Sequence, residues 1–153
     1  MNDRSDLSPL QRLDALIDRQ GPELAAIGRE ALRAVVQAMP TANRIVDESD
    51  GLLRIHHTPG MSLDHTIVTV SFHGYWVTYD FPQGDRMIDY DELLRRANKG
   101  MYHYVIEGPG DVKDREVEWL LNEAADRADP PPNPENHARL YFREDLNQKL
   151  PGA

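Results

Sequence analysis

Residues 66–81 read TIVTVSFHGYWVTYDF, two runs of β-branched and aromatic residues separated by His73-Gly74. Two such runs around a short glycine-containing break are typical of a β-hairpin with a two-residue loop. If His73 and Gly74 form the loop, Phe72 pairs with Tyr75. The sequence therefore predicts an antiparallel hairpin, around which the other segments can be placed.

The same register assigns each hairpin side chain to one face, because side chains alternate along a strand. One face is almost wholly apolar, and with Val70 opposite Val77 it holds Thr66, Val68, Val70, Phe72, Tyr75, Val77, Tyr79 and Phe81. The other face is mostly polar and holds Ile67, Thr69, Ser71, Trp76, Thr78 and Asp80. We therefore expect a sheet that is half buried, with helices covering the apolar face.

Two segments with helical periodicity are the natural covers for that face. The segment from about Pro22 to Met39 carries apolar residues at spacings of three and four, and Gly28 lies among them. A glycine there would let the helix approach the sheet closely. The segment from about Val112 to Ala128 has the same periodicity, and Asp111 with Asp114 resembles a capping box at its start.

Shorter elements fill the intervals. A helix is expected from about Pro9 to Arg19, with Ser8 as its N-cap. Residues 44–57 predict one or two short strands around a turn at Ser49-Asp50-Gly51, and Met101 to Glu107 predicts another strand. Between them, a short helix is expected to start at Asp89 or Asp91, to run through Leu93, Leu94 and Ala97, and to end at Gly100.

The predicted fold is a single α+β domain over residues 1–128, with a mainly antiparallel sheet and N-terminal and C-terminal helices packed on one face. Residues 130–134 read PPPNP, which favours a stiff, extended linker. Residues 129–153 are therefore interpreted as a linker and a C-terminal segment. The loose apolar pattern of residues 136–150 leaves three alternatives: a helix that packs on the sheet, one that docks on a partner, or a mobile tail.

Composition narrows the function classes. The chain has 153 residues, no cysteine and a formal net charge of −9, which excludes thiol catalysis and disulfide scaffolds. An acidic domain lacks the basic stripe of nucleic-acid-binding proteins, and it would be repelled by an anionic membrane surface. No apolar run reaches the length of a membrane span, and the first residues do not read as a signal peptide. We expect a cytoplasmic protein whose partner carries a basic surface.

The order of these elements resembles a known family. The similarity rests on Leu13–Ile17, Gly21-Pro22-Glu23-Leu24, Ala38-Met39-Pro40, Phe72-His73-Gly74, Leu93-Leu94, Lys99-Gly100-Met101-Tyr102-His103 and Leu120-Leu121. Over about residues 10–128 the chain resembles the YdhG-like family of small α+β domains, some of which are described as frataxin-like iron chaperones. The resemblance implies a frataxin-like fold and the handling of iron, and no other cofactor.

Aspartates are the best candidates for metal ligands, because carboxylates suit hard cations and ferrous iron. Asp14 and Asp18 are one helical turn apart, and Asp89 and Asp91 lie together near the start of the short predicted helix. The competing interpretation is structural: Asp89 and Asp91 cap a helix, and Asp14 and Asp18 form a solvated face. The histidines show no zinc-binding spacing on a predicted helix.

A second candidate site is the apolar strip formed by Trp76, Ile67 and His103 on the face away from the core. Such a strip either packs under another element or binds a partner. No Gly-x-Ser-x-Gly motif or phosphate-binding loop is present, so no catalytic residues are assigned.

These observations favour a non-catalytic cytoplasmic binding protein, with frataxin-like iron or metal handling as the version that the resemblance implies. The alternative is an acidic inhibitor or immunity-type protein that neutralises a basic protein partner such as a toxin or a nuclease.

Overall fold

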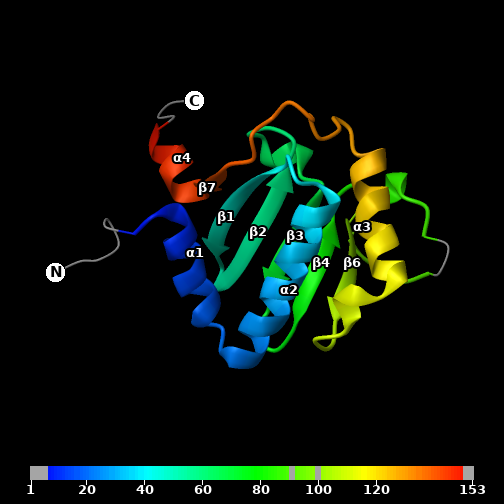
Figure 1. Ribbon diagram of the computed structural model, residues 1–153, viewed down its shortest axis with the longest axis horizontal. Helices are drawn as coiled ribbons and strands as arrows, with labels where there is room; N and C mark the ends of the chain where they lie inside the picture. Colours follow the sequence, from blue (N-terminus) through cyan, green and yellow to red (C-terminus); the bar gives the residue numbers. More distant parts are fainter. Residues whose placement is uncertain (1–6, 90–91, 99–100, 150–153) are drawn as a thin grey trace.

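The computed structural model describes residues 7–89, 92–98 and 101–149. They form an α+β fold built on a seven-stranded sheet with the order β5-β6-β4-β3-β2-β1-β7 (Figure 1). Every neighbouring pair of strands is antiparallel except β1 and β7, which are parallel. In these described ranges, each helix is too short or too polar to span a lipid bilayer.

The elements follow the predicted order with few exceptions. The strands are β1 (Asn43–Ser49), β2 (Leu52–Thr58), β3 (Val68–Phe72), β4 (Val77–Phe81), β5 (Arg95–Asn98), β6 (Met101–Ile106) and β7 (Leu140–Phe142). The α-helices are α1 (Pro9–Asp18), α2 (Pro22–Ala38), α3 (Arg115–Arg127) and α4 (Arg143–Lys149). Short 3-10 turns lie between β2 and β3 (η2, Leu63–His65), between β4 and β5 (η3, Gly84–Arg86) and between β6 and α3 (η4, Asp111–Lys113).

The central hairpin, β3 and β4, is confirmed, but its predicted register is wrong by two residues. Phe72 pairs with Val77, so the loop comprises the four residues from His73 to Trp76. A two-residue loop of type I′ needs positive φ at both central positions, and here only Gly74 has it (φ 92°). Because the slip is two residues, every paired side chain keeps its predicted face, whereas a slip of one would invert them all.

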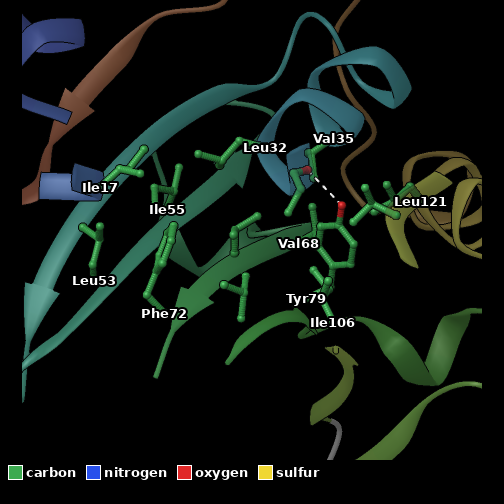
Figure 2. Packing of buried hydrophobic residues seen from close by; sticks show 14 of the residues in the cluster. Ile17, Leu32, Val35, Leu53, Ile55, Val68, Phe72, Tyr79, Ile106 and Leu121 are labelled. Carbon is green, nitrogen blue, oxygen red and sulfur yellow. Dashed lines mark hydrogen bonds between the residues drawn. The ribbon is translucent and has the colours of Figure 1, made fainter. Parts of the chain in front are cut away.

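Helices α1, α2 and α3 lie over the apolar face of the sheet (Figure 1), and the buried core fills the space between (Figure 2). The hydroxyl of Tyr79 donates a hydrogen bond to the Ala31 carbonyl oxygen of α2 (2.9 Å). A Cβ atom at Gly28 would lie 2.2 Å from Cζ of Phe72, so only a glycine allows this close approach. The predicted role of Gly28 is confirmed.

Two local predictions are wrong. No helix forms around Leu93 and Leu94; residues 95–98 instead pair with β6 as the edge strand β5. The carboxylate of Asp89 stabilises the chain just before β5, because it accepts hydrogen bonds from the Leu93 and Leu94 amides (2.9 and 2.8 Å). Asp91 and Gly100 lie outside the described residues.

The capping box predicted for the helix at about residues 112–128 is also wrong. Helix α3 begins at Arg115, and the side chain of its N-cap Asp114 makes no capping hydrogen bond. The Asp111 carboxylate accepts hydrogen bonds from the Glu107 and Gly108 amides instead (2.7 and 3.2 Å), and so it holds the turn that follows β6. At α1 the predicted cap is confirmed, since Ser8 and Gln11 form a reciprocal capping box.

The C-terminal segment joins the sheet. Of the three alternatives for residues 136–150, the structure has packing on the sheet, in a form that the sequence did not indicate. Leu140, Tyr141 and Phe142 add a parallel strand to the outer edge of β1, and α4 follows directly. Phe142 is buried in the core that the helices cover.

Candidate binding surface

The hairpin loop presents two large aromatic side chains to solvent. Tyr75 is 88% exposed and Trp76 is 46% exposed, and their ring centroids lie 6.4 Å apart. The Trp76 ring also stacks on His73, with centroids 6.0 Å apart. Tyr75 was predicted on the apolar face; it leaves the strand because the loop is two residues longer than predicted. Exposed tyrosine and tryptophan side chains are typical anchors of protein interfaces.

A hollow of about 770 Å³ lies beside this loop, at the end of the sheet where three segments converge. The segments are the α1–α2 turn with the start of α2, the tip of the hairpin, and the chain after β6. We call this region the tip hollow; it is lined by Gln20, Gly21, Pro22, Glu23, Leu24, Ala26, Ile27, Gly74, Tyr75, Glu107 and Pro109. Most of its lining surface is apolar.

The charged side chains that line the tip hollow are acidic. Glu23 and Glu107 are the charged side chains in its lining as far as the chain is described, and both are exposed. They come from different elements, the first turn of α2 and the end of β6. A ligand in the hollow would therefore meet a mostly apolar lining that also carries two carboxylates, which suits a cationic group on an apolar stem.

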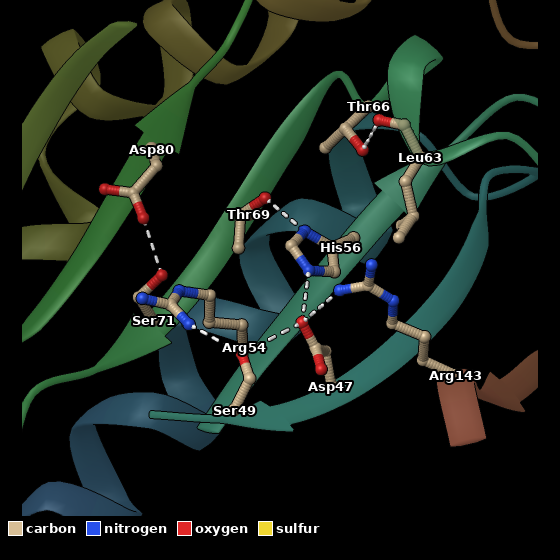
Figure 3. A network of polar contacts seen from close by, with 10 residues as sticks. All are labelled: Asp47, Ser49, Arg54, His56, Leu63, Thr66, Thr69, Ser71, Asp80 and Arg143. Carbon is tan, nitrogen blue, oxygen red and sulfur yellow. Dashed lines mark hydrogen bonds and ion pairs between the residues drawn. The ribbon is translucent and has the colours of Figure 1, made fainter. Parts of the chain in front are cut away.

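The face of the sheet opposite α2 carries a network of polar contacts (Figure 3). The Asp47 carboxylate accepts a hydrogen bond from Arg143 (3.0 Å), and it lies 3.7 Å from Nε2 of His56. Nδ1 of His56 is hydrogen-bonded to the Thr69 hydroxyl (2.8 Å). Burial lowers the pKa of His56, and the nearby Asp47 offsets part of this effect.

A hydroxyl, an imidazole and a carboxylate in this order are the parts of an activated nucleophile. The geometry argues against that role here, because Thr69 is only 4% exposed and offers a substrate no access. The carboxylate that would orient His56 is engaged by Arg143 and is too far from Nε2 for a hydrogen bond. This network therefore joins β1, β2 and β3 to the C-terminal segment.

A neighbouring set of hydrogen bonds is also structural. The Asp80 carboxylate accepts from the hydroxyls of Ser71 (2.5 Å) and Thr78 (2.9 Å), and the Thr78 hydroxyl is hydrogen-bonded to Nε2 of His73 (2.9 Å). Ser71 and Thr78 are buried, so these contacts satisfy polar groups on the face of the sheet opposite α2.

Of the predicted metal-binding aspartates, Asp14 and Asp18 lie together, but they share an arginine partner. Nη2 of Arg29 binds both Asp14 and Asp18 (3.1 and 2.8 Å), while Asp89 holds its own turn and Asp91 is outside the described residues. Within the described part of the chain, no group of three or more His, Asp or Glu side chains is placed to hold a metal ion. Metal binding at these residues stays a prediction.

The predicted strip of Trp76, Ile67 and His103 is dispersed. Trp76 lies in the hairpin loop, and His103 pairs with Asp80 nearer the other end of β4. Ile67 is 1% exposed and belongs to the core, because it precedes β3 and the strand alternation does not extend to it. Of the three, only Trp76 stands at the tip, and Tyr75, Glu23 and Glu107 were missed.

Fold and surface thus define an α+β domain with a mostly antiparallel sheet. Beside its aromatic hairpin tip lies a mostly apolar hollow that carries two glutamates. Comparisons with protein-family models, with curated proteins and with solved structures find no match to this chain. The resemblance to YdhG-like and frataxin-like domains stays a prediction.

Proposed function

We propose that this protein is a non-catalytic, cytoplasmic binding protein whose ligand is a basic segment of a protein partner, bound in the tip hollow. The observation that carries the proposal is the position of Tyr75, 88% exposed beside an apolar hollow with Glu23 and Glu107 in its lining. An arginine or lysine side chain would lay its apolar stem along Pro22 and Ile27 and place its charge near the two carboxylates.

Electrostatics over the whole chain support the same class of partner. A formal net charge of −9 attracts a basic surface over several ångströms and raises the rate of encounter. An arginine guanidinium also stacks well on an aromatic ring, so Tyr75 can contribute after the first encounter. A basic toxin or nuclease is a partner of this chemistry, and the protein would act on it as an inhibitor.

The proposal can be tested by an NMR titration of the ¹⁵N-labelled protein. The probe is the blocked hexapeptide Gly-Leu-Arg-Leu-Arg-Gly, and its control is the same peptide with citrulline, the neutral isostere, in place of arginine. We expect shift changes at residues 20–27, 74–76 and 107, with a Kd of about 1 mM or tighter. The citrulline peptide should bind about tenfold more weakly. Shifts that cluster elsewhere, or equal affinity of the two peptides, would contradict the proposal.

Variants then identify the binding groups. Tyr75→Ala should weaken binding of the arginine peptide several-fold without unfolding the protein, because that side chain is exposed. Glu23→Gln/Glu107→Gln should remove the preference for arginine over citrulline. The matched control is Asp126→Asn/Glu135→Gln, which removes the same charge at exposed positions away from the hollow.

A further inference from the structure

We infer that the outer edge of β1 is an exchangeable strand-binding site, and that a second copy of this chain can fill it with its own residues 140–145 to give a strand-swapped dimer. This site lies at the edge of the sheet opposite β5, and it shares no lining residue with the tip hollow. In the structure the chain fills the site itself, through β7 and the start of α4 (Figure 1).

The segment is attached through few backbone contacts. Strand β7 pairs with β1 over three residues only, preceded by a hydrogen bond from the Arg44 amide to the Arg139 carbonyl oxygen (2.8 Å). Its ion pairs join exposed side chains of the segment to largely buried partners: Arg143, Glu144 and Asp145 are 48%, 58% and 41% exposed, whereas Asp47 and Arg12 are 10% and 17% exposed. Because the strand pairing covers three residues, we expect the segment to open while the remaining sheet stays folded.

The site nevertheless recognises the segment specifically. Phe142 is 6% exposed, and the Arg12 guanidinium lies 3.7 Å from the centre of its ring. The same guanidinium binds Glu144 (2.8 Å) and Asp145 (2.9 Å). One arginine of α1 therefore contacts an aromatic ring and two carboxylates within four consecutive residues, a combination that another copy supplies unchanged.

The connection is long enough for exchange. Residues 129–139 include four prolines, and eleven extended residues span about 34 Å at roughly 3.1 Å each. Figure 1 shows this linker running from α3 past one end of the sheet to β7. It is fixed at Asn136, whose side-chain amide donates to the Thr41 carbonyl oxygen (2.7 Å) and to Oδ1 of Asn43 (3.1 Å).

A second copy is the ligand that fits best. Opening the segment leaves the outer edge of the seven-residue strand β1 unpaired, and an unpaired edge invites another strand. An identical segment restores the strand pairing, the Phe142 packing and the Arg12 contacts without a new interface. Since each copy carries a charge of −9, added salt should favour the dimer by screening the repulsion.

The first experiment shortens the linker. Deleting residues 131–134 from the full chain removes about 12 Å of reach and prevents β7 from returning to its own β1. We expect the mass measured by light scattering to change from that of the 17.4 kDa chain to twice that value, with a circular dichroism spectrum like the parent's. A folded monomer with a protease-sensitive tail would overturn the inference.

The second experiment does not depend on that variant's folding, and it uses the absence of native cysteine. One full-length chain carries Arg44→Cys and another Leu140→Cys, two positions that are partners in the β1–β7 register. The chains are mixed, held in mild urea to open the tail, returned to buffer and oxidised. We expect a disulfide between residues 44 and 140 of different chains, more abundant in added salt. In the control, the Leu140→Cys chain is mixed with a chain that carries Lys113→Cys, a remote exposed position. If the Arg44→Cys and Leu140→Cys chains give no more disulfide than this control pair, the inference is overturned.

Discussion

At the scale of single residues, Gly28 shows how the absence of one side chain positions a helix. A Cβ atom there would lie 2.2 Å from Cζ of Phe72, within the buried core. Alanine normally stabilises a helix interior by about 1 kcal/mol relative to glycine, so propensity and packing oppose one another at this site. The packing effect should be larger, because overpacking a buried site costs about 1–3 kcal/mol and the clash lies on an aromatic ring.

We therefore expect Gly28→Ala to lower the free energy of unfolding by about 1–2 kcal/mol, as measured by urea denaturation. Phe72→Leu removes the ring atoms involved and provides the second arm of a double-mutant cycle. In that background Gly28→Ala should be neutral or stabilising. An equal loss in both backgrounds would show that Phe72 is not the cause.

His57 makes stability depend on pH. Burial, with a contribution from the positive charge of Arg44, lowers its pKa to about 3, against about 6.5 in an unfolded chain. Between these values the unfolded chain binds a proton that the folded chain does not bind. The free energy of unfolding should therefore fall by about 1.4 kcal/mol for each unit as the pH drops from 6.5 towards 3.

Replacing His57 with leucine should remove this contribution. Neither ring nitrogen of His57 has a hydrogen-bond partner among the described residues, so an apolar side chain of similar size should be tolerated at pH 7. The measurement is urea denaturation of both proteins at several pH values. The wild type should lose stability more steeply on acidification than His57→Leu, and parallel curves would rule out the buried, neutral histidine.

At the scale of elements, the alternation of side chains predicted the faces of the hairpin strands correctly, whereas the predicted pairing register was wrong. The alternation in residues 66–81 was enough to predict which side chains of β3 and β4 face the helices. The structure confirms this, since Val70, Phe72, Val77 and Tyr79 belong to the apolar core, although Ser71 and Thr78 on the other face are buried as well. The loop was not predictable in the same way, because one glycine after a histidine is compatible with a loop of two or four residues. Tyr75, the centre of the proposed site, was misplaced for that reason.

Short elements failed for a different physical cause. Leu93 and Leu94 carry a helix-compatible pattern, yet the chain there is held by Asp89 and then by pairing of β5 with β6, a tertiary contact that local sequence does not encode. The three-residue strand β7 likewise exists only because the edge of β1 is free to receive it. Such elements depend on partners distant in sequence, and propensity alone cannot predict them.

The turn before β5 provides an element-scale prediction. Asp89→Ala removes the acceptor of two backbone hydrogen bonds, so β5 should loosen while the long helices remain stable. Amide hydrogen exchange should become at least tenfold faster at Leu93, Leu94 and Arg95, with little change in β2 and β3. Asp18→Ala, which removes a carboxylate paired with Arg29, is the control and should leave exchange in this region unaltered. Unchanged protection in Asp89→Ala would contradict the structural role of Asp89.

At the scale of the whole molecule, the apolar core and the C-terminal segment are unequal in size. The core joins the three longer helices to β1, β2, β3, β4 and β6, whereas the segment adds three paired residues, the ring of Phe142 and the half-buried Leu140. Most of the buried apolar area therefore forms without residues 140–149. The loss of the segment should leave a folded body behind, with the outer edge of β1 exposed.

We expect Phe142→Ala to separate two events that the wild type couples. Truncating a buried phenylalanine costs about 3–5 kcal/mol locally, which should exceed the stability of the three-residue strand pairing and release the segment. Limited proteolysis should then cut within residues 129–139, and hydrogen exchange should rise at β7 while β3 and β4 stay protected. Asp145→Asn, which weakens one ion pair of Arg12 while leaving that with Glu144, should leave the linker resistant. A single unfolding transition that shifts as a whole, with no early cleavage, would instead show that the C-terminal strand belongs to the same cooperative unit as the core.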